Sequence, residues 1–181
     1  KEELGEVFVF ITNTFFPVIE IGGRYMKKTN AMRELDKAGI DYQYYEYEVD
    51  EEHLGAIDVA LKTGQDISCV FKTLVLINEK KEMIVACIPG SDTIDLKKLA
   101  KVSSSKKVEM IEMKQLLPMT GYLRGGCSPI GIKKKHRSFL HHSALKKEKI
   151  LVSAGIRGLQ IEIAVKDLIS YVKMEVKDIV V

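Results

Sequence analysis

Cysteine and proline are scarce in this 181-residue sequence, which contains 3 and 4 of them, and glycine is present at an ordinary 13 copies. This composition excludes collagen-like and low-complexity chains. The cysteine count is odd and no secretory leader is recognisable, which favours reduced thiols and predicts a cytoplasmic location. Apolar residues make up 46% of the chain, enough for one globular domain with its own core.

The sequence also lacks a long uninterrupted hydrophobic run. Residues 7–21 (VFVFITNTFFPVIEI) are apolar and aromatic, but Thr12, Asn13, Pro17 and Glu20 interrupt them. A membrane-spanning helix needs about 20 apolar residues, and glutamates rather than basic residues precede this run, so neither a membrane span nor a signal peptide is expected.

Met26, followed by two lysines, resembles a natural start of translation. We therefore expect residues 1–25 to be an N-terminal extension, added as an extra strand or loosely attached. Residues 26–181 are then the functional domain.

Net charge is only +3, but it is unevenly distributed. Residues 101–150 hold 12 Lys and Arg against 3 Asp and Glu, a local charge of +9, whereas residues 1–50 carry 6 against 10. A basic segment on a nearly neutral chain indicates a polyanionic partner on one face. A solvated lysine-rich surface explains the charge equally well.

Periodicity and capping residues predict a single α/β domain with a mixed, partly barrel-like sheet of about six to seven strands and flanking helices. Helices are expected over residues 29–38, 50–62, 95–102 and 165–172, with a helical turn at 112–117 before Pro118. Strands are expected over residues 42–49, 70–77, 83–88, 108–111, 138–140, 150–153 and 159–164. No repeat or interdomain linker is visible.

The cysteines and histidines form no recognised metal or catalytic motif. Cys69, Cys87 and Cys127 share no close spacing, and the adjacent pair His141 and His142 would rarely bind one metal ion. We therefore expect no metal and no cofactor, and interpret the three thiols as packing residues.

Lys72 stands out because it interrupts the apolar strand VFKTLVLI. A buried cation requires a partner or an opening onto a cleft, although a lysine can also pack its stem and extend its amine into water. Together with the neighbouring Thr73, Lys72 is a candidate for contact with an anion or a carbonyl group.

Residues 121–131 (GYLRGGCSPIG), called the glycine loop below, form a second unusual segment. Glycines allow the main chain to approach a ligand, and successive N–H groups can bind phosphate or an oxyanion. The loop matches neither a Walker loop, nor a dinucleotide fingerprint, nor a nucleophile elbow.

Two basic features follow the glycine loop. The basic tract, residues 133–137 (KKKHR), comes directly after it, and Arg157 lies in the turn SAGIRG between two expected strands. Arg157 suits a phosphate or the carboxylate of Glu162. Both features suit a nucleic-acid backbone, although charge runs are often only solvated.

In this order, the motifs TNAMRELDKAGI, YEYEVD, VFKTLV, IDLKKLAK, KKVEM, GYLRGGCSPIG and SAGIRGLQIEIA resemble the YbaK/EbsC family of aminoacyl-tRNA deacylases, relatives of the editing domain of bacterial prolyl-tRNA synthetase. The resemblance spans residues 28–177. It implies a trans-editing enzyme that clears cysteine from mischarged Cys-tRNA(Pro), and also from Cys-tRNA(Cys). The implied partners are aminoacylated tRNA and a prolyl-tRNA or cysteinyl-tRNA synthetase, with no membrane.

The resemblance also assigns site residues. The implied catalytic set is Lys72 with the main chain of Gly125, Gly126 and Ser128, and the implied substrate-binding residues are Tyr47, Thr73, Pro129, Arg157 and Gly158. Gly155 belongs to the same strand-turn motif. Gln160 departs from the family pattern, which often has an acidic residue there.

The implied chemistry needs no nucleophile from the enzyme, because the thiol of the bound cysteine can attack its own ester carbonyl. Two alternatives remain open at this point. One is a deacylase for another small amino acid such as alanine or serine, and the other is a non-catalytic module that binds tRNA or a synthetase.

Overall fold

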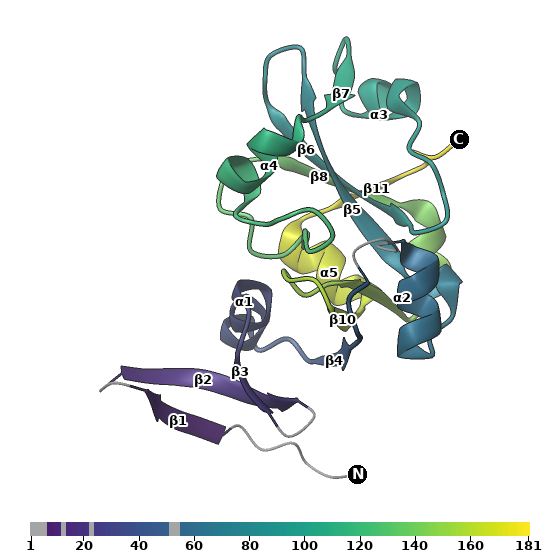
Figure 1. Cartoon of the computed structure of the whole chain (residues 1–181). Coiled ribbons are helices and arrows are strands. Elements are labelled where there is room, and N and C mark those ends of the chain that lie inside the picture. The colour runs from purple at the N-terminus through teal and green to yellow at the C-terminus, as the bar shows by residue number, and fades with distance from the viewer. Residues whose placement is uncertain (1–6, 12–13, 22–23, 51–54) are drawn as a thin grey trace.

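A five-stranded mixed sheet occupies the centre of the computed structural model, which describes residues 7–11, 14–21, 24–50 and 55–181, with side chains from residue 26 onward (Figure 1). Its strand order is β11-β8-β6-β5-β7. β5 and β6 form an antiparallel hairpin, β7 pairs antiparallel with β5, and β8 and β11 add in parallel. The strands are β5 (Phe71–Asn78), β6 (Met83–Pro89), β7 (Val108–Met110), β8 (Arg137–His141) and β11 (Glu175–Lys177).

A smaller antiparallel sheet has the order β4-β10-β9. It consists of β4 (Tyr42–Glu46), β9 (Lys149–Ser153) and β10 (Leu159–Ala164). A parallel bridge between Val70 and Leu151 joins the start of β5 to β9, so the two sheets meet at this point. The expected mixed α/β fold is confirmed, in the form of two sheets that meet at their ends.

The helices pack their apolar faces against the two sheets. They are α1 (Asn30–Ala38), α2 (Ala56–Thr63), α3 (Leu96–Val102), α4 (Met113–Thr120) and α5 (Val165–Val172), with 3-10 turns η1 (Ile67–Cys69) and η2 (His142–Lys146). α1 and α5 pack in one core with residues of the smaller sheet, whereas α3 packs with Ile84, Ile88 and Phe139 of the larger one.

The boundaries of α1 follow from its caps. Thr29 Oγ1 accepts a hydrogen bond from the Met32 N–H at 3.2 Å, and Gly39 ends the helix in the left-handed region at φ 67°. The predicted helix over residues 29–38 is therefore correct.

Several expected elements need correction. The strand expected over residues 42–49 ends at Glu46 in β4. Pro118 lies inside α4, rather than after it, within the last four residues of the helix. β11 was not expected, because a three-residue parallel strand depends on β8 rather than on its own sequence. α2 begins at Ala56 after Gly55, and residues 51–52 of its expected acidic start lie outside the described residues.

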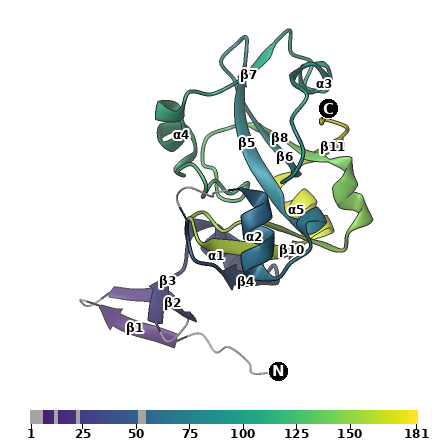
Figure 2. The same ribbon diagram turned by 45° about the vertical axis from the view of Figure 1, so that its right-hand side comes forward.

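The first strands form a separate meander. β1 (Val7–Ile11), β2 (Thr14–Ile21) and β3 (Arg24–Lys27) pair only with one another in the described part of the chain. In both views this meander projects away from the rest of the protein beyond α1 (Figures 1 and 2).

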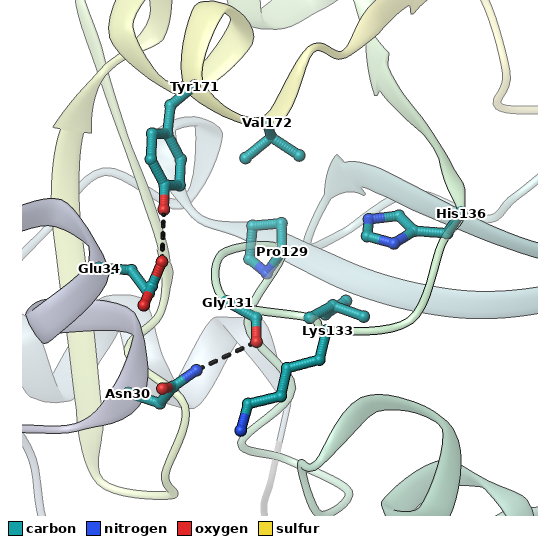
Figure 3. Close-up of a pocket in the computed structure, with 9 residues that line it drawn as sticks. Asn30, Glu34, Pro129, Gly131, Lys133, His136, Tyr171 and Val172 are labelled. Carbon is teal, nitrogen blue, oxygen red and sulfur yellow. Dashed lines mark hydrogen bonds between the residues drawn. The ribbon is translucent and has the colours of Figure 1, made fainter. Parts of the chain in front are cut away.

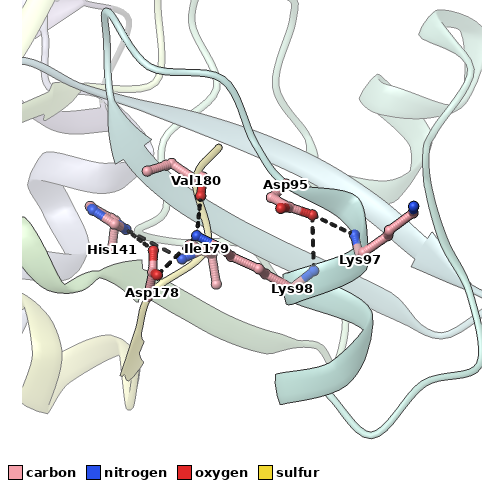
Figure 4. Close-up of polar contacts among 7 residues, drawn as sticks. All are labelled: Asp95, Lys97, Lys98, His141, Asp178, Ile179 and Val180. Atoms are coloured by element: carbon pink, nitrogen blue, oxygen red, sulfur yellow. Dashed lines mark hydrogen bonds and ion pairs between the residues drawn. The ribbon is translucent and has the colours of Figure 1, made fainter.

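Polar contacts hold the C-terminal residues against α3 (Figure 4). Lys98 Nζ donates to the carboxylate of Asp178 at 2.9 Å and to the carbonyl of Val180 at 2.8 Å. The Ile179 N–H donates to His141 Nδ1 at 3.3 Å, and Ile179 itself is fully buried. These contacts position β11 and close the core beneath α3.

We expect the segment 26–181 to fold without residues 1–25, because in the described part of the chain the strands of the meander pair only with one another, and Met26, which packs against the core, is kept. Removing residues 1–25 should leave the midpoint of thermal unfolding within about 3 °C of that of the full chain, a difference of roughly 1 kcal/mol for a protein of this size. Calorimetry on the two proteins measures this. A loss of cooperative unfolding in the shorter chain would show that the meander is part of the domain.

Candidate functional site

Lys72 lies on β5, half-buried, and its ammonium group donates to the carbonyl of Gly90 at 2.9 Å. Burial lowers the pKa of this ammonium group below its ordinary value, and the carboxylate of Asp92 acts in the opposite direction. An ammonium group has three N–H donors, and within the described residues Gly90 is its one hydrogen-bond acceptor. Lys72 can therefore still donate to a ligand.

Thr73 faces the opposite way from Lys72, because successive side chains of a strand alternate. Its hydroxyl lies 3.6 Å from the sulfur of Cys87, its cross-strand neighbour on β6. The two adjacent candidates therefore occupy different faces of the sheet, and Thr73 is engaged in packing.

Internal hydrogen bonds hold the glycine loop in one conformation. The buried Tyr122 hydroxyl donates to the Ile130 carbonyl at 2.6 Å, and Ser128 Oγ accepts from the Ile130 N–H at 3.2 Å. Asn30 on α1 donates to the Gly131 carbonyl at 3.0 Å. Ser128 is fully buried, so its hydroxyl supports the loop, and only its main chain is suited to meet a ligand.

The glycine loop packs directly on the turn between β9 and β10. A Cβ at Gly126 would lie 2.9 Å from the Ile156 carbonyl carbon and 3.0 Å from the Arg157 nitrogen, so no side chain fits there. Arg157 Nε donates to the Arg124 carbonyl at 2.8 Å and ties the turn to the loop. The close approach of the two main chains therefore requires glycine at position 126.

Tyr47 makes further contacts with the turn between β9 and β10. Its N–H donates to the Gly158 carbonyl at 2.9 Å, and a Cβ at Gly158 would lie 3.0 Å from the Tyr47 carbonyl oxygen. The Tyr47 hydroxyl accepts from Gln160 Nε2 at 3.5 Å, so the amide of Gln160 reaches the tyrosine.

Tyr47 also links the turn to the lysine. Tyr47 and Ala56 pack against the cluster that contains Val70, and the Gly90 N–H donates to the Val70 carbonyl at 2.8 Å. Gly90 abuts Ala56 and accepts from Lys72.

The structure thus brings Gly126, Arg157, Gly158, Tyr47 and Lys72 into one connected set of contacts. Within the described chain, no hydrogen bond or ion pair joins Lys72 directly to residues 125–128. Pro129 is buried and lines a different cavity, against α1 and α5.

The main-chain donors of the glycine loop are its most informative feature. The N–H of Gly126 donates to Leu123, but those of Gly125, Cys127 and Ser128 have no hydrogen-bond acceptor among the described residues. Cys127 and Ser128 are buried. Because buried N–H groups are almost always paired, successive free donors are typical of a site that receives an anion or a carbonyl oxygen.

Two of the three cysteines, Cys87 and Cys127, are poor nucleophiles. Burial raises the pKa of both the Cys87 and the Cys127 thiols to about 12. A thiol with such a pKa is protonated at neutral pH, and only the thiolate attacks carbonyl carbon. Cys127 therefore contributes its main chain and its packing to the loop.

Two histidines and one carboxylate, His141, His142 and Asp178, converge near the C-terminus and could offer ligands to a metal ion. Two of the three are already engaged. Nδ1 of His141 accepts from Ile179, and Asp178 is paired with the ammonium group of Lys98. The arrangement serves to hold the C-terminal residues.

Sequence reasoning missed Gly90 and Tyr122. Gly90 is the acceptor for Lys72, and a Cβ there would lie 2.1 Å from that of Ala56. Tyr122 supports the glycine loop from within the motif itself, and Gly155 packs on its ring. The position of Gly90 directly after β6 was the sequence signal that could have identified it. No local signal in the sequence marks Tyr122.

Comparisons with known proteins agree with this geometry. The model of the aminoacyl-tRNA editing domain family matches residues 51–171. The chain belongs to this family. It is 48% identical over 144 residues to a candidate Cys-tRNA(Pro)/Cys-tRNA(Cys) deacylase, EbsC, of Enterococcus faecalis, an alignment that covers 80% of this chain and 88% of the relative.

Solved structures support the fold. The crystal structure of a candidate trans-editing enzyme for prolyl-tRNA synthetase superposes with a TM-score of 0.75 at 18% identity, covering 84% of this chain and 95% of the other. That of a hypothetical protein gives 0.77 at 16% identity, with coverage of 84% and 100%. α1 and β4 precede the range matched by the family model, yet α1 contributes to the core.

The predicted family is therefore confirmed, and with it the expectation of an aminoacyl-tRNA deacylase. Among the described residues, no helix has both the length and the apolar character needed to cross a membrane.

Gly126→Ala should separate the glycine loop from the 155–158 turn, since its Cβ would lie within 3.0 Å of that turn's main chain. We expect deacylation of Cys-tRNA to fall at least roughly tenfold, equivalent to about 1.4 kcal/mol in the barrier, while circular dichroism still reports a folded protein. Gly55→Ala is the matched control, because its nearest neighbour would be 3.5 Å away. Equal activity in the two variants would contradict this role of Gly126.

Proposed function

We propose that this protein is a trans-editing enzyme that releases cysteine from Cys-tRNA(Pro) and Cys-tRNA(Cys). The observation that carries the proposal is the set of main-chain donors in the glycine loop, at Gly125, Cys127 and Ser128, that have no acceptor among the described residues. Donors fixed in advance where negative charge develops are a large source of catalysis in acyl transfer. In this proposal they receive the carbonyl oxygen of the aminoacyl ester.

The nucleophile is the thiol of the substrate's own cysteine. Its sulfur forms a bond to the ester carbonyl carbon, and the bond from that carbon to the ribose oxygen breaks. The thiol proton passes to the ribose hydroxyl, and a cyclic thioester leaves, which water then opens to cysteine. The raised pKa values of Cys87 and Cys127 and the complete burial of the Ser128 side chain support a mechanism without a nucleophile from the enzyme.

Lys72 binds the other end of the same ligand in this proposal. An aminoacylated adenosine is long enough to contact two separated groups, so the lysine and the glycine loop need not touch. The spare donors of the Lys72 ammonium group suit a phosphate oxygen or an oxygen of the terminal adenosine. Tyr47, Arg157 and Gly158 lie between the two and complete the wall.

This mechanism selects substrate by reactivity. One methylene or a comparable change in size gives a pocket only about 1–3 kcal/mol of discrimination. A cysteine thiol, with a pKa near 8.5, is about a tenth thiolate at pH 7.5, whereas a serine hydroxyl or an alanine methyl offers no such nucleophile. Cysteine is therefore cleared even where similar residues bind.

The remaining assignments follow from the substrate. We propose that prolyl-tRNA synthetase or cysteinyl-tRNA synthetase delivers the charged tRNA, because the name of the Enterococcus relative includes both tRNA(Pro) and tRNA(Cys). The enzyme works in the cytoplasm, where tRNA is charged, and the working domain is residues 26–181.

Lys72→Ala should lower kcat/KM for Cys-tRNA at least roughly tenfold, because it removes a positive charge from the binding wall. Lys72→Arg keeps the charge and should recover part of the loss. Lys97→Ala, which removes an exposed lysine from α3, is the matched control and should leave turnover unchanged. Unchanged turnover in Lys72→Ala would rule out this role of the lysine.

A panel of Cys-, Ser- and Ala-tRNA tests the nucleophile. We expect fast release of cysteine alone, with a rate that rises about tenfold per pH unit up to the thiol pKa near 8.5 and then levels off. Trapping of the cyclic thioester by an added amine should accompany the release. Serine or alanine released as fast as cysteine would favour hydrolysis by water and a broader deacylase.

A further inference from the structure

The three lysines at positions 133–135 form a consecutive run of positive charge. All three are exposed, and their ammonium groups make no hydrogen bond or ion pair to any described residue. Elsewhere in the segment 101–150, Arg137 pairs with Glu175 and Lys107 pairs with Glu109. Four other exposed basic residues, Lys101, Lys106, Arg124 and Lys146, also form no ion pair with a described residue, but they are scattered along the sequence, whereas the three lysines are consecutive.

The main chain of this lysine ridge, residues 133–135, is fixed. It leaves the glycine loop at Gly131, whose carbonyl is bound by Asn30. At its other end His136 Nδ1 lies 2.7 Å from the carbonyl of Lys134, and because a carbonyl only accepts, Nδ1 carries the proton. The lysines are thus presented from a held turn at the end of the candidate site.

Hollows lie on both sides of the ridge. One cavity of about 380 Å³ is lined by Lys133 and His136 on one side and by Glu34 and Tyr171 on the other (Figure 3). The second, of about 710 Å³, is lined by Lys134, Lys135 and Arg137 together with Lys81, Ser103 and Ser105.

The acidic side chains in these hollows form no ion pair with the three lysines among the described residues. Glu34 accepts from the Tyr171 hydroxyl at 3.0 Å, and Glu82 accepts from the Asn78 side-chain amide at 2.7 Å. Both are turned toward partners other than the lysines. The ridge and the adjoining hollows therefore suit a polyanion with regularly spaced charges.

We propose that the lysine ridge binds the phosphate backbone of the tRNA acceptor arm while the 3′ end lies in the editing site. This rests on the proposed function. Ser128 and Lys133 are five residues apart, so at most about 18 Å separates their Cα atoms. The 3′ end of a tRNA is single-stranded, and over that length one strand presents about five charges.

Contacts of this kind position a nucleic acid without reading its sequence. The ridge should therefore hold tRNA(Pro) and tRNA(Cys) equally well. Discrimination is left to the aminoacyl group and to any synthetase that delivers the substrate.

The test measures binding of uncharged tRNA by the full chain across a series of salt concentrations. Combined Lys133→Ala, Lys134→Ala and Lys135→Ala should weaken binding at least tenfold and reduce the slope of log affinity against log salt by about 2 to 3, close to one for each phosphate that no longer meets a lysine. The corresponding triple arginine variant should keep the slope of the natural protein.

The matched control replaces Lys37, Lys166 and Lys177 with alanine. These lysines are exposed and have no partner among the described residues. Replacing them removes the same net charge from other surfaces. Binding within threefold of the natural protein is expected. An equal loss in the control would show that net charge, rather than the ridge, governs binding and would overturn the proposal.

A second substrate separates this proposal from the proposed function. Cysteinyl ester of adenosine alone has no acceptor arm, so the triple alanine variant should cleave it as fast as the natural protein does. If the natural protein cleaves neither substrate, the deacylase proposal fails while the binding result still stands. If both enzymes cleave and the triple variant binds tRNA with an unchanged salt slope, the lysine ridge is not the tRNA surface.

Discussion

The close approach of two main chains, at Gly126 and at the Ile156–Arg157 peptide, is the constraint on which the site depends. No side chain fits between them, and the Arg157 contact to the Arg124 carbonyl holds them together. Gly158, in the same turn, accepts a hydrogen bond from the Tyr47 N–H. Tyr47 packs on the cluster next to Gly90 and Lys72. This approach therefore sets the position of the free loop donors relative to the lysine.

The arrangement fits a reaction that needs few chemical groups from the enzyme. The loop offers main-chain donors, Lys72 offers a cation, and the buried thiols and the buried Ser128 hydroxyl offer no nucleophile. An activated ester needs little more than positioning and stabilisation of its developing charge when it carries its own nucleophile. The fold then supplies geometry, and the misplaced amino acid supplies reactivity.

Local signals in the sequence predicted the elements that depend on local chemistry. α1 has its cap at Thr29 and its stop at Gly39, and β5 and β6 read as buried strands. Sequence analysis missed features that depend on residues distant in the sequence. β11 forms because β8 lies beside it, and the last turn of α4 accommodates Pro118. The same division holds in the site. The family motifs indicated Lys72 and the glycine loop, and the alternation of side chains in the predicted strand already implied the opposite direction of Thr73. The acceptor role of Gly90 depends on the pairing of β6 with β5.

The most direct test of the central claim is a crystal structure with a non-hydrolysable amide analogue of cysteinyl-adenosine bound. We predict that the carbonyl oxygen of the analogue lies within hydrogen-bond distance, about 2.7–3.2 Å, of the Cys127 and Ser128 nitrogens, with its thiol next to the carbonyl carbon. A carbonyl oxygen pointing away from the glycine loop, toward a water or a side chain elsewhere, would contradict it.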